Sequence, residues 1–507
     1  MMKKFISTYL AGVMMALAFT SCSLDRKPFS AVEDDGMLKD PSKWSAATGG
    51  NYAMLKEANF TRNYVQIGEF PSDDIVFVKT STDNLFFSYN YVHIPAQANV
   101  YQLWTMGYKA INGCNRLLEA MEAGKSPATD QLIGENLFIR AFVHFSMVKI
   151  FGRPYPQQAS TNLGIPVVTK ANAPVPPKRN TVREVYDQVI ADLKRAKDLM
   201  NNDNTNSYAT SSAAKALLAR VYLYREQNDS AYIYADSVIN YGMISSRVKL
   251  KLLPGDALPG YFTKNNESNE ETIFAIRHTL QDDRDWASLG SMFYTSPGGM
   301  GYGEVYASEP YRELLDKYPQ DIRHAFIQAA GYMKKTNGED SIGPNGKKVV
   351  IKAGRDTATW ADKWYILKYS NQEGVPTLSS PVVLRLAEMY LIRAEASAKM
   401  GKMDAAIADV NIIRQRAGLS GSALFSTTDL KGYPSVLDVV LDERRLELAF
   451  EAQRSFDLFR NNRSVIRNYK GVHPPNQVIR ATDEKVLHYI PEQDILLNPN
   501  LVQNPIQ

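Results

Sequence analysis

The sequence is poor in cysteine and histidine, the residues on which many metal sites and disulfide-rich folds depend. Two cysteines among 507 residues cannot build a disulfide framework. The six histidines are scattered and show no His-Glu-x-x-His spacing. The chain also has no Gly-x-Ser-x-Gly elbow and no phosphate-binding loop. We therefore expect no catalytic residue, no metal ion and no cofactor.

An excess of one charge is also missing. Lysine and arginine total 58 against 54 aspartates and glutamates, a net charge of +4 without long runs of one sign. This balance gives no support for a nucleic-acid partner. The hydrophobic fraction of 44% and the charged fraction of 22% are those of an ordinary globular protein. The length predicts two to four domain-sized units or one large composite domain.

The N-terminus has the features of an export signal. Lys3 and Lys4 precede an apolar stretch at 9–19 that is too short to cross a bilayer. Small or polar residues then lead to Cys22, as in a lipoprotein box. We expect residues 1–21 to be a signal peptide and Cys22 to carry the lipid anchor, where several acyl chains hold better than one. Cys114 is then left without a partner, and we expect it to be a small buried residue.

Helical patterns recur in pairs along the chain. Apolar residues at helical spacing predict helices at 100–123, 132–151, 181–200, 211–224 and 229–240. Thr181 followed by Glu184 fits a capping box. Ser380 before Pro381 predicts another helix start, Gly401 ends that helix, and a partner helix follows at 404–416.

Two of these stretches, 216–240 and 387–414, resemble each other. Each has an apolar helix rich in alanine and tyrosine, a short polar turn, and a second helix that opens with alanine. Small residues at such positions let antiparallel helices pack closely, as in tetratricopeptide repeats. The predicted fold class is therefore mainly α, with tetratricopeptide-like helical repeats.

The segment 243–379 differs from the helical blocks. Glycine, proline, asparagine and aspartate are frequent, and short β-like runs occur at 272–276, 349–351 and 365–369. Residues 69–96 and 152–180 are similar in character. Long irregular segments within a folded domain are usually functional. We expect the helices to form the scaffold and a loop-rich, partly β region to form the ligand-binding surface.

Several motifs carry a family resemblance. They are 140–145 (RAFVHF), 213–223 (AAKALLARVYL), 386–396 (LAEMYLIRAEA), 409–414 (DVNIIR), 442–451 (DERRLELAFE) and the tail 498–504 (NPNLVQN). Their order, together with Cys22, resembles the SusD/RagB family of outer-membrane nutrient-binding lipoproteins. The resemblance covers essentially the whole mature chain.

The resemblance implies an architecture and a partner. It implies helix pairs that support ligand-binding loops, with an N-terminal helical part at 22–250, a loop-rich binding region at 251–379 and a C-terminal helical part at 380–507. It also implies a position at the outer membrane, anchored by lipid and facing the cell surface. The implied partner is a SusC-type TonB-dependent transporter, with a glycan as ligand.

Three glutamates raise the alternative of a glycoside hydrolase. Glu443, Glu447 and Glu451 recur every four residues and so share one helix face. A glycosidase needs two carboxylates about 5–9.5 Å apart. Arginines are interspersed, however, which favours ion pairs that keep the carboxylates charged and inert. We expect a structural role for this face and no catalysis.

Flat aromatic rings are the side chains that a sugar face packs on. Trp286, Trp360 and Trp364 lie in loop-rich sequence, and Tyr294 and Tyr302 flank a glycine cluster at 298–301. Trp104, by contrast, has helical neighbours and is expected in the core. For each loop ring, packing within the protein is the alternative to ligand contact.

An acidic segment completes the predicted site. Asp73 and Asp74 precede Phe77 and Asn84, in the place where the resemblance implies an acidic pair followed by an aromatic-rich binding loop. Phe77 and Tyr302 match family positions that hold stacking aromatics. Since neither is tryptophan, a starch-type specificity is not implied.

The favoured hypothesis is a surface lipoprotein that captures glycan fragments for a transporter. The alternatives are capture of peptides, as the RagB branch suggests, and a lipid-anchored glycoside hydrolase.

Overall fold

The fold is mainly α-helical. The computed structural model describes residues 38–78, 84–171, 175–201, 204–245, 248–296, 300–329 and 363–505. Ser45–Gln507 form one compact unit, and the N-terminal segment Met1–Trp44 is a separate one. The described residues contain fourteen α-helices, α3 to α16, and five two-stranded antiparallel sheets. The prediction of a mainly α fold with tetratricopeptide-like repeats is confirmed.

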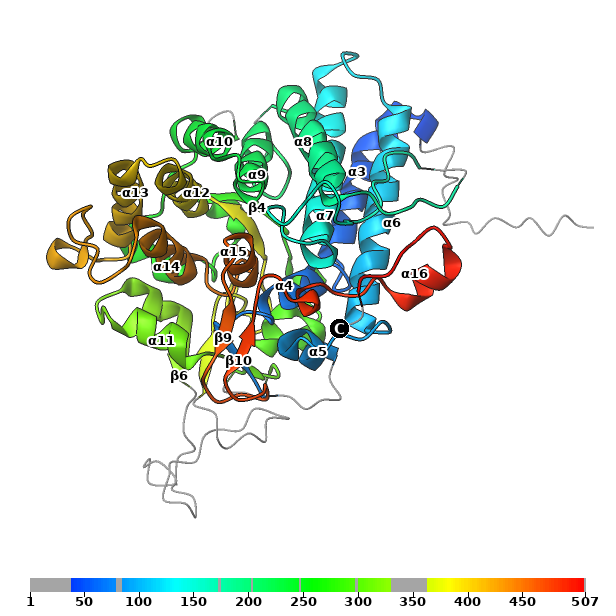
Figure 1. The fold of residues 1–507 in the computed structure, drawn as a ribbon. Helices are drawn as coiled ribbons and strands as arrows, with labels where there is room; N and C mark the ends of the chain where they lie inside the picture. Colours follow the sequence, from blue (N-terminus) through cyan, green and yellow to red (C-terminus); the bar gives the residue numbers. More distant parts are fainter. Residues whose placement is uncertain are drawn as a thin grey trace, which may run out of the picture. The chain divides into compact units, whose positions relative to one another are not determined.

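A succession of packed helices forms the frame (Figure 1). Each contacts the next along the chain, and α10 contacts α12. The series comprises α6 (Ala98–Ala120), α7 (Pro127–Phe151), α8 (Val182–Leu199), α9 (Ser211–Tyr224), α10 (Asn228–Tyr241), α12 (Leu386–Lys399), α13 (Met403–Arg416) and α14 (Val436–Leu448). The helices predicted between residues 100 and 240 are all present, with ends that differ by a few residues. Among the described helices, none is long and apolar enough to span a bilayer.

Shorter elements surround this frame. The remaining helices are α3 (Trp44–Lys56), α4 (Thr61–Glu69), α5 (Asn84–Asn90), α11 (Glu309–Asp316), α15 (Arg454–Arg460) and α16 (Glu492–Leu497). The strand pairs are β1 (Ile75–Phe77) with β5 (Val305–Ala307), β2 (Met243–Ser245) with β3 (Val248–Lys249), β4 (Thr272–Ala275) with β8 (Val382–Arg385), β6 (Ile327–Ala329) with β7 (Trp364–Ile366), and β9 (Val465–Arg467) with β10 (Gln477–Ile479).

The start of α8 shows how local sequence fixes a helix end. The Thr181 hydroxyl accepts a hydrogen bond from the Glu184 backbone N–H (3.2 Å), and the Glu184 carboxylate accepts one from the Thr181 N–H (2.8 Å). These two bonds satisfy donors that a helix start leaves unpaired. The predicted capping box is confirmed.

The helix start predicted at Ser380 is wrong. Val382–Arg385 form β8, which pairs with β4, and the helix begins only at Leu386. The Ser380 hydroxyl accepts a hydrogen bond from the backbone N–H of His278 (2.9 Å) and so fixes the strand pair instead of capping a helix. Of the predicted β-like runs, 272–276 contains β4 and 365–369 overlaps β7, while 349–351 lies outside the described residues.

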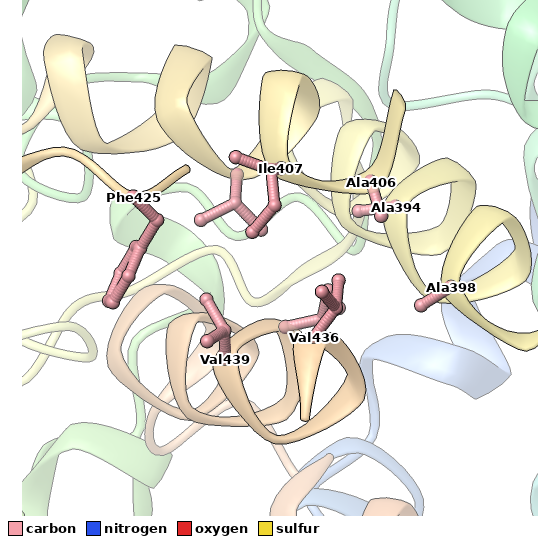
Figure 2. Packing of buried hydrophobic residues seen from close by; sticks show 9 residues of the cluster. Ala394, Ala398, Ala406, Ile407, Phe425, Val436 and Val439 are labelled. Carbon is pink, nitrogen blue, oxygen red and sulfur yellow. The ribbon is translucent and has the colours of Figure 1, made fainter. Parts of the chain in front are cut away.

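Small side chains bring the last three frame helices close together (Figure 2). Ala394 and Ala398 of α12 pack with Ala406 of α13, and Val436 and Val439 of α14 close the same cluster. All five are buried. Because alanine occupies little space, the helices can approach as the repeat pattern predicted.

Candidate functional site

Two of the predicted ring residues lie together at the surface. Trp286 belongs to a short 3-10 turn at Asp285–Ala287, and Tyr302 lies beyond the glycine cluster. Their ring centroids are 4.9 Å apart with an interplanar angle of 59°. Trp286 is 39% exposed, and Tyr302 is half-buried. A pair of this kind offers a ring surface on which a flat ligand can pack.

Hydrogen bonds within residues 283–288 fix the position of Trp286. The Ser288 hydroxyl donates to Asp283 (2.6 Å) and accepts from the Arg284 backbone N–H (2.9 Å). Asp285 has a φ of 48°, in the left-handed region that non-glycine residues seldom adopt. Such strain persists where the surroundings determine it, and it is concentrated at functional sites.

The neighbouring chain holds this turn from two sides. Arg62 of α4 donates from Nη1 to the carbonyl of Ala287 (2.9 Å), one residue after Trp286. The Thr377 hydroxyl donates to the second carboxylate oxygen of Asp283 (2.9 Å). The turn that carries Trp286 is therefore attached to α4 and to the loop that contains Thr377.

Backbone contacts and two glycines place Tyr302. The N–H groups of Tyr302 and Gly303 both donate to the carbonyl of Ser291, at 2.6 and 2.9 Å. Gly301 and Gly303 have φ values of 99° and 53°. A Cβ on Gly301 would lie 2.2 Å from the carbonyl oxygen of Tyr294, so only glycine fits. Gly301 is thus the member of the glycine cluster that shapes the backbone before Tyr302; Gly298 and Gly299 lie outside the described residues.

A cleft adjoins the turn and is lined in part by charged and polar groups. Its lining includes Arg62, Arg284, Asp282 and Ser288. Burial lowers the pKa of Arg62, the Tyr302 hydroxyl opposes this, and the like charge of Arg284 adds to it. Burial disfavours the Asp282 carboxylate, but the hydrogen bonds from Lys56 and Thr279 together outweigh this and lower its pKa to about 2. These groups can donate to and accept from ligand hydroxyls. Arg62 was not among the predicted site residues.

The other predicted rings do not join the pair. Tyr294 is half-buried and packs edge-on against Tyr365, with centroids 5.7 Å apart, at the margin of an internal cluster. Phe77 is fully buried, and it packs between Phe70 and Tyr89 at 5.4 and 5.7 Å. Its ring presents no face to solvent, because β1 directs it into the core. Trp360 lies outside the described residues.

The predicted acidic pair is engaged in ion pairs. Asp73 receives Nε of Arg454 at 2.8 Å, and Asp74 receives Nε of Arg445 at 2.5 Å. Burial alone would raise the pKa of Asp73, but the charges of Arg445 and Arg454 outweigh burial and lower it. Both carboxylates therefore connect the segment before β1 to the C-terminal helices. Asn84 is exposed at the first position of α5.

The three helix-face glutamates are bound by arginine and lysine. Glu443 contacts Arg323 and Arg414 at 2.7 and 2.9 Å. Glu447 and Glu451 share Arg385, at 2.5 and 2.9 Å. Burial disfavours the Glu447 carboxylate, but the surrounding cations outweigh it and lower its pKa far below the usual value. A general acid needs a raised pKa, so the ion pairs do not suit Glu447 to that role.

The described residues contain no group of three or more histidine, cysteine or acidic side chains arranged to hold a metal ion. Cys114 is buried and free, and Trp104 is buried, as predicted. Cys22 lies outside the described residues.

Two family models match the chain over most of its length. One, described as "Starch-binding associating with outer membrane", matches residues 24–223, and the other, "SusD family", matches residues 270–506.

Individual proteins are similar over nearly the whole chain. A SusD-like protein of Formosa agariphila, P38, is 24% identical over 99% of both chains. A SusD-like protein of Bacteroides ovatus is 24% identical over 89% of this chain and 82% of its own. The crystal structure of a SusD superfamily protein from Bacteroides thetaiotaomicron has a TM-score of 0.78 at 26% identity, covering 92% of this chain and 99% of that one. A putative sugar-binding protein of Bacteroides vulgatus has a TM-score of 0.75 at 26% identity and covers 92% and 98%.

Proposed function

Since the chain belongs to the SusD family of carbohydrate-binding proteins, we propose that it captures glycan fragments on the rings of Trp286 and Tyr302. The observation that carries this proposal is the ring pair, with centroids 4.9 Å apart, in which Trp286 lies on a turn held from two sides. The C–H face of a pyranose packs on such rings. Arg62, Arg284 and Asp282 in the adjoining cleft supply polar groups for the hydroxyls.

The proposal includes an anchor and a partner. The lipid on Cys22 holds the protein to the outer membrane on the cell surface, and a SusC-type TonB-dependent transporter receives the glycan. In this arrangement the region 251–379 supplies the binding loops, and the helical parts at 22–250 and 380–507 carry them. Nutrient capture, not catalysis, is the proposed role, which fits the ion-paired state of Glu443, Glu447 and Glu451.

Affinity gel electrophoresis against a panel of polysaccharides tests the binding site. We expect at least one polysaccharide to retard the protein, and we expect Trp286→Ala and Tyr302→Ala each to weaken its binding about tenfold, the loss that one stacked ring predicts. Tyr241→Ala is the matched control, since Tyr241 is 75% exposed on α10. If no polysaccharide retards the protein, or if the control weakens binding as much as the two site variants, the proposed site is wrong.

The anchor and the partner are tested in cells. Labelling with a palmitate analogue should mark the wild type and not Cys22→Ala. A TonB-dependent barrel should co-purify with the tagged protein from outer membranes. An unlabelled wild-type protein would contradict the anchor, and purification without a barrel would contradict the partner.

A further inference from the structure

A second cavity, separate from the Trp286 cleft, lies where α7, α8, α9 and α15 approach one another. It shares no lining residue with the cleft. Aromatic rings form part of its wall. The rings of Tyr155 and Tyr186, with centroids 4.8 Å apart, line it together with those of Tyr224, Phe456 and Phe459. Such rings give a small flat ring surfaces to pack on.

Two buried cations lie in this wall, and one of them, Arg460, is paired with Glu395 and Asp457. The side chain of Lys149 lines the cavity, is buried, and its Nζ has no hydrogen-bond partner among the residues that the structure describes. The ammonium faces four rings instead, with Phe456, Phe145, Tyr64 and Tyr224 at 4.5 to 5.6 Å from their centroids. Ring faces attract a cation, but a desolvated ammonium is ordinarily also paired with an anion.

The carboxylate whose charge favours the Lys149 ammonium is Glu388, and it is already paired with an arginine. Glu388 receives both Nε and Nη2 of Arg220, at 2.6 and 2.5 Å. Burial lowers the pKa of Lys149, the Tyr64 side chain partly offsets this, and the charge of Arg220 lowers it further. At the mouth, Arg153 donates to the carbonyls of Thr482 and Asp483, at 3.1 and 2.7 Å. Lys149 is thus a buried cation without an anion of its own.

We propose that this cavity is a second binding site, for a small aromatic ring that carries one carboxylate. The ring packs against Tyr155 and Tyr186, and the carboxylate accepts hydrogen bonds from the Lys149 ammonium. Phe456 is half-buried and lies 4.5 Å from Nζ, so the carboxylate reaches the ammonium when this ring turns aside. Because Arg460 is already paired, the one buried cation without an anion selects a monoanion. The site is independent of the proposed glycan site.

Calorimetric titration of the purified protein with benzoate, and with benzyl alcohol as the uncharged probe, tests the assignment. We expect saturable 1:1 binding of benzoate to the wild type. Lys149→Met keeps the length of the side chain and removes the charge, so benzoate should bind about ten- to a hundredfold more weakly while benzyl alcohol binds as before. Lys402→Met is the matched control: Lys402 also lies over a ring, that of Tyr232, but on the surface.

Further variants provide a second test of the cavity and show whether the two sites act separately. Tyr155→Ala at the mouth should weaken the binding of both probes, and it serves if Lys149→Met does not fold. Trp286→Ala should leave benzoate binding unchanged, and Lys149→Met should leave polysaccharide binding unchanged, so the two sites fail separately. Absence of saturable benzoate binding to the wild type, or equal affinity in Lys149→Met, would overturn the proposal.

Discussion

Replacing Gly301 by alanine should disturb the ring pair without removing a ring. Gly301 precedes Tyr302 and has a φ of 99°. An added Cβ would lie 2.2 Å from the Tyr294 carbonyl oxygen, whereas real Cβ contacts stay above 3.0 Å. The backbone must therefore move by about 1 Å. That shift opens the hydrogen bond from the Tyr302 N–H to the Ser291 carbonyl, now 2.6 Å long, and carries the ring away from Trp286.

The expected loss in the free energy of unfolding has two parts, and a control variant separates them. Alanine at positive φ costs about 1–2 kcal/mol. Loss of the backbone hydrogen bond adds about 0.5–1.5 kcal/mol. We expect Gly301→Ala to lower the free energy of unfolding by about 2–3 kcal/mol. Gly374 has a similar φ, 81°, and no atom lies within 4 Å of the place that a Cβ would take there, so Gly374→Ala should incur only the first part.

Denaturant unfolding measures the two free energies, and gel retardation measures polysaccharide binding. Gly301→Ala should bind about tenfold more weakly, as Tyr302→Ala does, and Gly374→Ala should bind like the wild type. If Gly301→Ala binds polysaccharide with unchanged affinity while its stability falls as expected, the ring pair does not depend on this backbone geometry. The reasoning about how Tyr302 is positioned would then be refuted.

Two further predictions concern buried charge. Burial raises the pKa of Glu135 to about 7, although hydrogen bonds with Gln131 and Tyr52 oppose the rise. The folded state therefore holds this proton more tightly than the unfolded state does. As a result, the stability of the protein falls as the pH rises from 4.5 to 7. Glu135→Gln should therefore stabilise the protein at pH 8 by up to about 3 kcal/mol and have little effect at pH 4. Thermal unfolding at the two pH values measures both effects. Equal effects at the two pH values would contradict the raised pKa of Glu135. Arg385→Ala leaves Glu447 and Glu451 without their shared partner and should lower the free energy of unfolding by about 3–5 kcal/mol. Lys251→Ala breaks an exposed pair with Glu270 and should lower it by less than about 1 kcal/mol. Denaturant unfolding measures both losses. Similar costs for both would contradict the importance of burial.

Local sequence was sufficient where local interactions decide the structure. The capping box at Thr181 involves residues three apart, and the helix spacing of 211–224 reproduces α9 without change. Ser380 and Pro381 have the same local appearance of a helix start, yet the next residues pair with β4, more than a hundred positions earlier. Periodicity carries no information about such a distant partner, so the strand was missed.

The same distinction applies to the site. Trp286 and Tyr302 were predicted because a large ring in irregular sequence has little core to join, and the structure brings these two rings together. Phe77 was misleading because its three-residue strand is buried along its whole length, which no alternation in the sequence reveals. Arg62 was not found at all: it is one arginine in a helix, and only the fold places its guanidinium against Ala287.

The way in which the ring pair is fixed bears on the affinity it can provide. Binding to a mobile loop loses free energy to the ordering of that loop, and this loss falls when the site is already held in its bound form. Here Arg62 fixes the turn of Trp286 to α4, and the strand that follows Tyr302, β5, is paired with β1. The segment between the two rings is therefore attached near both of its ends, to α4 and to β1. A rigid pair of rings selects ligands by shape, because it cannot close around a fragment that does not match its angle. The elements around the helical frame thus contribute to recognition by supplying these attachment points, and α4 itself contacts the frame helices α6 and α7.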